Sequence, residues 1–165
     1  MVLGLLSDTH LRSADERLGR LLSGVLGPAE VLLHAGDFIS EGVVAHLECA
    51  DPRPFYGVAG NMDSDSVVGR LPSRRVLDLG GRRVGLVHGW GGPQGIEERL
   101  LGAFSEPLDL LVFGHTHRPS QIRIGRTLLV NPGSAFDRRF APRCTVALVS
   151  VEPGGIEVRI EEVDA

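Results

Sequence analysis

The sequence has no lysine, two cysteines and no long apolar run. All 17 basic residues are arginine, which we attribute to the base composition of the gene and not to thermal adaptation. No apolar stretch approaches the roughly 20 residues that a membrane-spanning helix requires. The apolar stretch at the N-terminus is too short for a signal peptide and lacks its basic start. We therefore expect a cytoplasmic protein without a membrane partner.

The cysteines and the net charge exclude further roles. Cys49 and Cys144 lie far apart and show no metal-ligand spacing, so we expect two buried, reduced thiols. A net charge of −4 gives no general footprint for nucleic acid, which disfavours a nucleic-acid partner. With 165 residues, 42 % of them hydrophobic and 23 % charged, the chain suits one globular domain over residues 1–165.

Strands and helices alternate in the first half of the chain. Short apolar runs predict buried strands, and apolar residues at helical spacing predict helices between them. The predicted strands are Val2–Leu6, Val31–Leu33 and Phe55–Val58, and the predicted helices are Ala14–Leu26 and Glu41–Glu48. Strand–helix–strand units of this length imply a parallel sheet.

The second half is richer in strand. Turn signals that contain glycine predict three hairpins. Their strands are Arg75–Leu79 with Val84–His88, Gln121–Ile124 with Thr127–Val130, and Thr145–Val151 with Ile156–Val163. In addition, Ile96–Phe104 predicts a helix and Leu110–Phe113 a buried strand. We therefore expect a mixed α/β fold with two packed sheets and helices outside them.

Side chains that commonly bind metals follow five of the predicted strands. Because loops at the carboxyl ends of strands converge on one crevice, we expect these side chains to lie together. They are Asp8, His10, Asp37, Asn61, His88, His115 and His117. A lone Asp-x-His or His-x-His is more often an incidental surface pair, but chance does not account for the whole ordered set. Glycines beside several of them allow the backbone to approach a metal or phosphate closely.

The predicted ligands are four histidines, two carboxylates and one amide oxygen. Mn²⁺, Fe²⁺, Zn²⁺ and Ni²⁺ prefer such a mixed set, whereas Mg²⁺ prefers oxygen. Seven ligands exceed the needs of one tetrahedral ion and suit two ions that share an aspartate. Two ions about 3.5–4 Å apart can clamp the attacking and leaving oxygens of a phosphoryl transfer. We expect a dinuclear centre, with Mn²⁺ as the first candidate.

Other polar residues fall outside this set. His34 is expected to pack behind the ligands, and His46 to lie on a helix surface. Arg118, Arg138 and Arg139 lie near the later motifs, and any of them could grip a phosphate with two hydrogen bonds. A solvated surface position is the default interpretation for each arginine.

The ordered motifs resemble those of the calcineurin-like metallophosphoesterase superfamily. They are Asp8-x-His10, Gly36-Asp37, Gly60-Asn61-x-Asp63, His88-Gly89 and Gly114-His115-x-His117. The resemblance extends to Asn131-Pro132-Gly133-Ser134, a motif similar to that of the short bacterial and archaeal phosphodiesterase branch. It implies a four-layer αββα sandwich in which two mixed sheets are flanked by helices.

The same resemblance implies roles for the ligands. One metal would be held by Asp8, His10, Asp37 and His117, and the other by Asp37, Asn61, His88 and His115, with Asp37 bridging. The implied reaction is hydrolysis of a small phosphodiester, nucleotide-like or cyclic, by a hydroxide between the two ions. Asp37, Asn61 and His88 would then take part in catalysis.

The chain departs from the family pattern at two positions. Met62 stands where many relatives carry a histidine that helps the leaving group depart, and a thioether cannot donate a proton. We therefore expect good leaving groups, such as those of aryl diesters or strained cyclic phosphates, to be favoured, and we expect Asp63 to hold the loop. Trp90 stands where relatives often have a second histidine; it walls the pocket, stacks on a base or simply packs.

There are three alternatives to a small-molecule phosphodiesterase, two of them enzymatic and one non-catalytic. A phosphomonoesterase would use the same metal ligands. A non-catalytic scaffold, like the phosphoesterase-like subunit of retromer, is disfavoured because every ligand position is filled. A nuclease subunit is disfavoured because such enzymes usually add a capping domain. The physiological substrate, the cellular metal and any homo-oligomeric state stay open.

Overall fold

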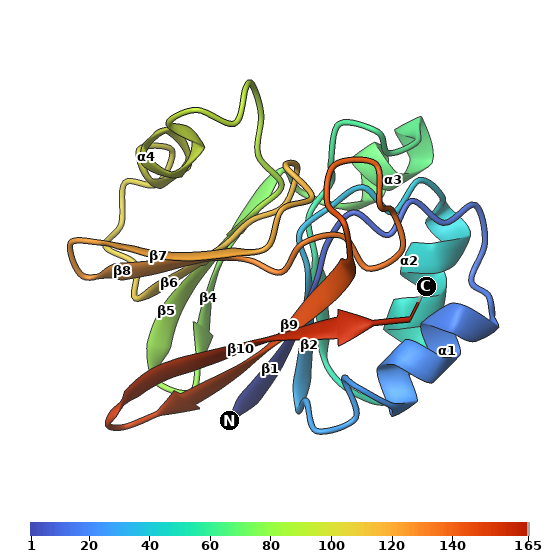
Figure 1. The fold of residues 1–165 in the computed structure, drawn as a ribbon, viewed down its shortest axis with the longest axis horizontal. Helices are drawn as coiled ribbons and strands as arrows, with labels where there is room; N and C mark the ends of the chain where they lie inside the picture. Colours follow the sequence, from blue (N-terminus) through green and yellow to red (C-terminus); the bar gives the residue numbers. More distant parts are fainter. Residues whose placement is uncertain (165) are drawn as a thin grey trace.

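Two five-stranded sheets pack face to face in the computed structural model, which describes residues 1–164 (Figure 1). The first sheet contains β1 (Val2–Leu6), β2 (Val31–His34), β3 (Phe55–Gly57), β9 (Cys144–Glu152) and β10 (Gly155–Val163). The second contains β4 (Arg74–Leu79), β5 (Arg82–Val87), β6 (Leu110–Val112), β7 (Ser120–Ile124) and β8 (Thr127–Asn131). The strand orders are β10-β9-β1-β2-β3 and β4-β5-β6-β8-β7.

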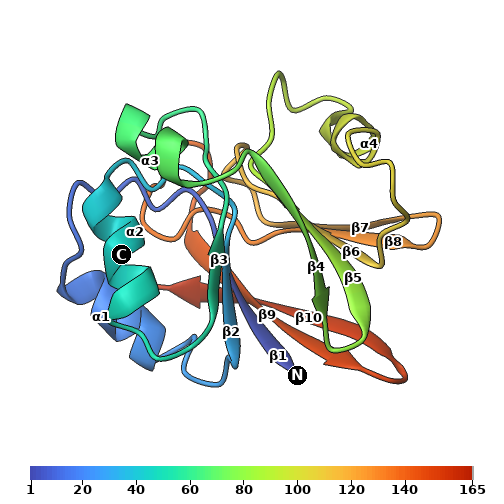
Figure 2. The same cartoon turned by 180° about the vertical axis from the view of Figure 1, so that it is seen from behind.

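Both sheets are mixed. Strands β1, β2 and β3 pair in parallel, and β9 and β10 continue that sheet in antiparallel pairing. Strands β5, β6 and β8 pair in parallel between the antiparallel edge strands β4 and β7. Helices α1 (Glu16–Ser23), α2 (Glu41–Cys49) and α3 (Asp65–Arg70) lie beside the first sheet, and α4 (Ile96–Leu101) lies beside the second (Figure 2). The predicted αββα sandwich is confirmed.

Burial on both faces explains why the inner strands read as continuous apolar runs. In β1, Leu3 and Leu5 join the cluster between the sheets, whereas Leu6 joins the cluster beneath the helices. A separate cluster, which includes Ile96 and Leu100 of α4, covers the outer face of the second sheet. Apolar layers therefore cover both faces of each sheet, and the loops at the strand ends extend from this packed core.

Helix α1 is shorter than the predicted helix Ala14–Leu26. The Asp15 side chain caps it by accepting the backbone N–H of Arg17 at 3.0 Å, and Gly24 caps its C-terminus. Beyond Gly24 the chain continues in turns, yet Leu26 is fully buried. The helical spacing of apolar residues therefore continues past the end of the helix, because turn residues also contribute to the core.

Three further features differ from the sequence-based expectations. Helix α4 ends at Leu101 and not at Phe104, because Gly102 forms its C-cap. The short helix α3 was not predicted. Cys144 is buried as expected, but Cys49 is exposed on α2, so the prediction of two buried thiols is wrong for Cys49. Within residues 1–164, no helix combines the length and apolarity that crossing a membrane requires.

Candidate metal centre

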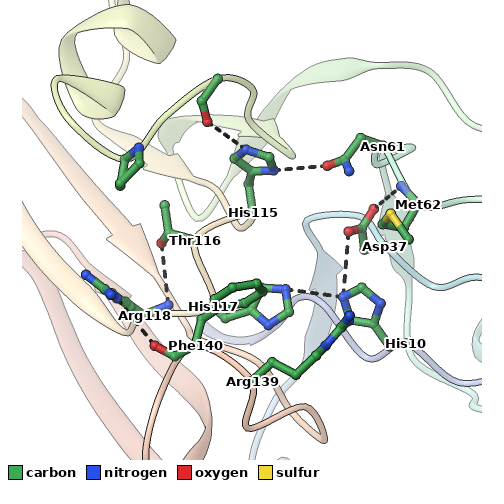
Figure 3. A pocket seen from close by; sticks show the side chains of 12 residues that line it. His10, Asp37, Asn61, Met62, His115, Thr116, His117, Arg118, Arg139 and Phe140 are labelled. Atoms are coloured by element: carbon green, nitrogen blue, oxygen red, sulfur yellow. Dashed lines mark hydrogen bonds and ion pairs between the residues drawn. The ribbon is translucent and has the colours of Figure 1, made fainter.

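The predicted ligands meet at the edge of the sandwich where the parallel strands end. They form two groups on either side of Asp37, which we name the carboxylate cluster (Asp8, His10 and His117) and the amide cluster (Asn61, His88 and His115). The clusters draw on the loops after β1, β3, β5 and β6, and Asp37 comes from the loop after β2. Figure 3 shows side chains from both clusters pointing into one pocket. The structure brings all seven residues together, while their roles as ligands stay a prediction.

The carboxylate cluster contains a buried oxygen that lacks a hydrogen-bond partner. Asp8 Oδ1 lies 3.2 Å from His117 Nε2 and 3.9 Å from His10 Nε2, and these two nitrogens are 3.2 Å apart. Among the described residues, Asp8 Oδ1 makes no hydrogen bond. A buried carboxylate oxygen without a partner is costly. A divalent cation among the three side chains would satisfy it, so the cluster fits a metal.

In the amide cluster, the backbone orients both histidines. Nδ1 of His88 lies 2.7 Å from the carbonyl oxygen of Ala35, and Nε2 of His115 lies 2.9 Å from that of Gly91. Because a carbonyl only accepts, those ring nitrogens must carry the protons. The opposite nitrogens then face Asn61 Oδ1, at 2.9 Å for His88 and 3.0 Å for His115. In the neutral rings, three lone pairs converge, an arrangement that fits a cation.

Asp37 lies between the clusters. Its Oδ2 is 3.6 Å from His10 Nε2 and 3.4 Å from His88 Nε2, and its Oδ1 accepts the backbone N–H of Met62 at 2.8 Å. Asp8 also lies near both clusters, because one of its carboxylate oxygens is close to the potential ligand atoms of Asp37 and His88. The position of Asp37 Oδ2 agrees with the predicted bridge.

The carboxylates create a field that favours positive charge. Burial alone would raise the pKa of Asp37, but the hydrogen bond and charge of His88 and the backbone N–H of Met62 outweigh burial and lower this pKa. Burial would lower the pKa of His88, but Asp37 and Asp8 raise it above its ordinary value. At His10, burial outweighs the nearby carboxylates and lowers the pKa. The same field that draws a proton to His88 would stabilise a bound cation.

The ligand loops adopt an unusual backbone conformation. Left-handed φ angles occur at Asp8 (51°), His10 (49°), Asp37 (61°), His115 (70°) and His117 (57°). Such angles are uncommon outside glycine and cost of order 1–3 kcal/mol each. Hydrogen bonds of 3.0 Å from Asp8 N to Gly36 O and from His10 N to Asp37 O help to hold two of the loops. Backbone strain is therefore concentrated at the predicted ligands.

Two glycines allow these loops to pack closely. A Cβ at Gly60 would overlap the Asp37 carboxylate, and a Cβ at Gly114 would overlap Ser7 and Asp8. The expectation was that glycine lets the backbone approach a metal or phosphate. What the structure shows at these positions is close approach to the acidic side chains themselves.

The residues outside the clusters largely behave as expected. His34 is fully buried, accepts the N–H of Gly36 at its Nδ1 (3.1 Å) and lies 3.2 Å from Thr9 Oγ1 through its Nε2. His46 is half-buried on α2.

Asp63 holds its loop in place. It accepts backbone N–H groups from Gly60, Asp37 and Ile39 at 2.7, 3.1 and 2.7 Å, and its burial raises its pKa. The structural role expected for Asp63 is confirmed.

A pocket of about 380 Å³ opens beside the clusters. Its wall beyond the predicted ligands includes Met62, Pro93, Arg118, Arg139 and Phe140. Trp90 lines a second pocket, of about 420 Å³, together with Ser73 and Arg74. Of the three arginines singled out in the sequence, Arg138 is absent from the walls of both pockets.

The sequence interpretation missed Asp137. Its Oδ2 lies 3.9 Å from His10 Nε2, 3.7 Å from His117 Nδ1 and 2.5 Å from Arg139 Nη2. Burial alone would raise the pKa of Asp137, but the hydrogen bonds to Arg139 outweigh burial and lower this pKa. The residue follows β8 in an irregular segment, where neither a motif nor periodicity marks it in the sequence.

Comparisons with known proteins show what the whole chain is similar to. Residues 1–154 match the model of the calcineurin-like phosphoesterase superfamily domain. A probable metallophosphoesterase of Methanothermobacter thermautotrophicus is 34 % identical over 140 residues, which cover 81 % of this chain and 77 % of the relative.

Two solved structures share the fold. One, described as a novel archaeal phosphodiesterase, is 20 % identical with a TM-score of 0.79 and covers 99 % of this chain and 100 % of its own. The other, Vps29 of Entamoeba histolytica in complex with Zn²⁺, is 23 % identical with a TM-score of 0.67 and covers 98 % and 99 %. Together with the match over residues 1–154, the clusters and the fold show that this chain belongs to the calcineurin-like phosphoesterase superfamily, whose metallophosphoesterases bind divalent metals.

Proposed function

We propose that this protein is a metal-dependent phosphodiesterase with two divalent ions in its site. The convergence of lone pairs supports the proposal most directly. Asp8 Oδ1 is buried without a hydrogen-bond partner in the described chain, and Asn61 Oδ1 meets two oriented ring nitrogens. A bound cation would satisfy both arrangements. The substrate would be a small phosphoester, and its diester class is supported by the resemblance to short phosphodiesterases.

The two clusters would share Asp37. The carboxylate cluster with Asp37 would hold one ion, and the amide cluster with Asp37 would hold the other. The mixed nitrogen and oxygen ligand set suits Mn²⁺, our first candidate, and also Fe²⁺, Zn²⁺ and Ni²⁺. When bound, such a pair supplies Lewis-acid activation of water and of the phosphoryl group.

The reaction adds water to phosphorus, breaks one ester P–O bond and returns a proton to the leaving oxygen. Arg118 lines the pocket, and its Nε donates to the carbonyl oxygen of Phe140 at 3.3 Å. Its two Nη atoms make no hydrogen bond among the described residues, so they are available to an anionic substrate. Arg139 also lines the pocket, but its pairing with Asp137 offsets its charge.

Protonation of the leaving group is the weak point of this site. Met62 is 53 % exposed in the pocket and cannot donate a proton. Asp63 is occupied by three backbone N–H groups and holds the loop. Diesters with weakly basic leaving groups should therefore react fastest.

A hydrolysis screen tests the proposal. The wild type and Asp37→Ala are assayed with bis-p-nitrophenyl phosphate and with p-nitrophenyl phosphate, in Mn²⁺ and in EDTA. We expect Mn²⁺-dependent hydrolysis by the wild type that favours the diester. A preference for the monoester would instead make the protein a phosphomonoesterase.

A non-catalytic scaffold is the second candidate, because the fold is shared with Vps29, a vacuolar protein sorting subunit. Protein that binds metal yet hydrolyses neither ester above the Asp37→Ala background would overturn the enzymatic proposal and favour a scaffold.

A further inference from the structure

Two pockets flank the amide cluster. Asn61 lines both of them, while His115 lines only the first and His88 only the second. The rings of these two histidines meet edge to face, with centroids 5.3 Å apart. The amide cluster therefore borders both a pocket of about 380 Å³ and one of about 420 Å³.

Each pocket carries an exposed aromatic side chain. Phe140 in the first pocket is 58 % exposed, and Trp90 in the second is 46 % exposed. Phe and Trp bury most of their surface on average, and both of these exposed rings line pockets at a polar site, where they could contact a ligand. The first pocket also has Met62 and Pro93 as apolar wall.

The backbones of both aromatic residues are tied down by arginine. Arg118 Nε donates to the carbonyl oxygen of Phe140 at 3.3 Å, and Arg99 Nε donates to that of Trp90 at 3.2 Å. Arg99 also bonds the carbonyls of Gly92 and Gln94, so it braces the whole loop around Trp90. An exposed ring on a braced loop is pre-organised to receive a flat group at low entropic cost.

A phosphodiester has two ester substituents that diverge from one phosphorus atom. A phosphate held at the amide cluster would have its substituents directed away from each other, and a pocket with an aromatic wall lies on either side. A monoester or a cyclic nucleotide has only one flat group and would fill one of these pockets. The two pockets thus match the shape of an open diester.

We propose, on the basis of the phosphodiesterase function above, that the substrate is an open, two-armed diester with a planar group on each arm. One planar group stacks on Phe140 and the other on Trp90. This narrows the expectation drawn from Met62 alone, which also admitted cyclic phosphates. Nucleotide-type diesters with a base on each side belong to this class.

A kinetic comparison tests the two-armed substrate. Bis-p-nitrophenyl phosphate has two planar arms, whereas methyl p-nitrophenyl phosphate keeps the leaving group and has one. The variants are Trp90→Ala and Phe140→Ala, with Trp90→Phe as the conservative change. Ile122→Ala is the control, because Ile122 is also an exposed apolar residue (43 %) but lies on β7 outside both pockets.

We expect each alanine variant to lower kcat/KM for the bis-aryl diester by about tenfold, the scale of one stacking contact. Only one of the two alanine variants should lower kcat/KM for the methyl ester. Trp90→Phe should keep most of the activity that Trp90→Ala loses. Ile122→Ala should change neither substrate. The intrinsic reactivity of each ester cancels when variants are compared on the same substrate. Equal losses of kcat/KM on both substrates, or no loss on either, would therefore overturn the proposal.

Binding gives a second readout that does not depend on turnover. Trp90 is the only tryptophan of the chain, so its fluorescence reports on the second pocket alone. Titration of the metal-loaded protein with a slowly hydrolysed adenylyl-adenosine phosphorothioate should quench it saturably. No quenching would overturn the two-armed binding mode. Quenching without hydrolysis of any ester would refute the proposed function while upholding the pockets.

Discussion

The carboxylate cluster contains the carboxylate of Asp8, whereas the amide cluster contains no carboxylate and lines both pockets. Asp8 is fully buried, while Asn61 is exposed. In the described chain His117 Nδ1 has no hydrogen-bond partner, but both histidines of the amide cluster face backbone carbonyls. One cluster therefore offers charge and the other offers oriented ligands.

The magnitudes indicate which advantage is larger. Partners that orient a metal ligand are typically worth about 10–100-fold in affinity. Two unit charges 4 Å apart interact by about 4 kcal/mol at an effective dielectric constant of 20, and a divalent ion doubles that figure. The carboxylate of Asp8 should therefore outweigh the orientation of the amide cluster. We expect the carboxylate cluster to bind its ion more tightly and the amide cluster to face the substrate.

Removal of Asp37 should have the largest effect, because its carboxylate contacts both clusters. We expect Asp37→Ala to reduce kcat/KM for bis-p-nitrophenyl phosphate more than about 10³-fold while the fold persists, as seen by circular dichroism. Glu157→Ala, on the exposed side of β10, is the matched loss of a carboxylate. Substantial activity in Asp37→Ala would mean that the bridge is wrongly assigned.

Asp8→Asn and Asn61→Ala compare the clusters directly. Asp8→Asn removes charge at constant size and should weaken the tighter Mn²⁺-binding step about 100-fold or more in a calorimetric titration. Asn61→Ala should leave that step intact and weaken the second. If Asn61→Ala weakens the tight step more than Asp8→Asn does, ligand orientation outweighs charge and our ranking of the clusters is reversed.

Met62→His should act on the substrate side of the amide cluster. A positioned acid contributes about 10²–10⁴-fold in established sites, and an imperfectly placed one should give about tenfold. We expect this gain for poor alkyl leaving groups and little change for nitrophenol. The measurement is kcat/KM across diesters of increasing leaving-group pKa. A wild-type series without any such dependence, left unchanged by the substitution, would show that our interpretation of Met62 is wrong.

The pH dependence of stability tests the burial of His34, which packs behind the clusters. Burial lowers the pKa of His34 to about 3, partly offset by Asp8. Below a pH of about 6.5 the unfolded chain takes up a proton that the folded chain does not, so acid destabilises the fold by about 1.4 kcal/mol per pH unit from this residue.

The metal-free wild type and His34→Gln, unfolded in urea between pH 6.5 and 4, isolate this contribution. We expect the stability advantage of the wild type to shrink as the pH falls. A constant difference between the two proteins would show that His34 can be protonated in place.

The meeting of the seven side chains could be predicted from the sequence because it follows from topology, while their roles as ligands stay a prediction. Asp8, Asp37 and His88 each come directly or soon after a buried strand, and parallel strands deliver their carboxyl ends to one edge. The continuous apolar runs of β1 and β2 likewise predicted strands buried on both faces. These features depend on local pattern plus a general rule of sheet architecture.

Other features could not be predicted because they depend on contacts distant in sequence. Asp137 reaches His10 across more than a hundred residues from a segment without periodicity. The bond from Arg99 to the Trp90 loop depends on how α4 packs on its sheet. Cys49 lies on the exposed side of α2, where composition alone suggested burial. The left-handed angles of the ligands likewise carry no sequence signal outside glycine.

Metal stoichiometry tests the central claim of two clusters around Asp37 most directly. Protein saturated with Mn²⁺ and freed of excess metal would be analysed by elemental analysis, beside Asn61→Ala as the variant with one cluster impaired. We predict about two Mn²⁺ per chain for the wild type and about one for Asn61→Ala. A firm plateau at one Mn²⁺ in the wild type would contradict the dinuclear centre.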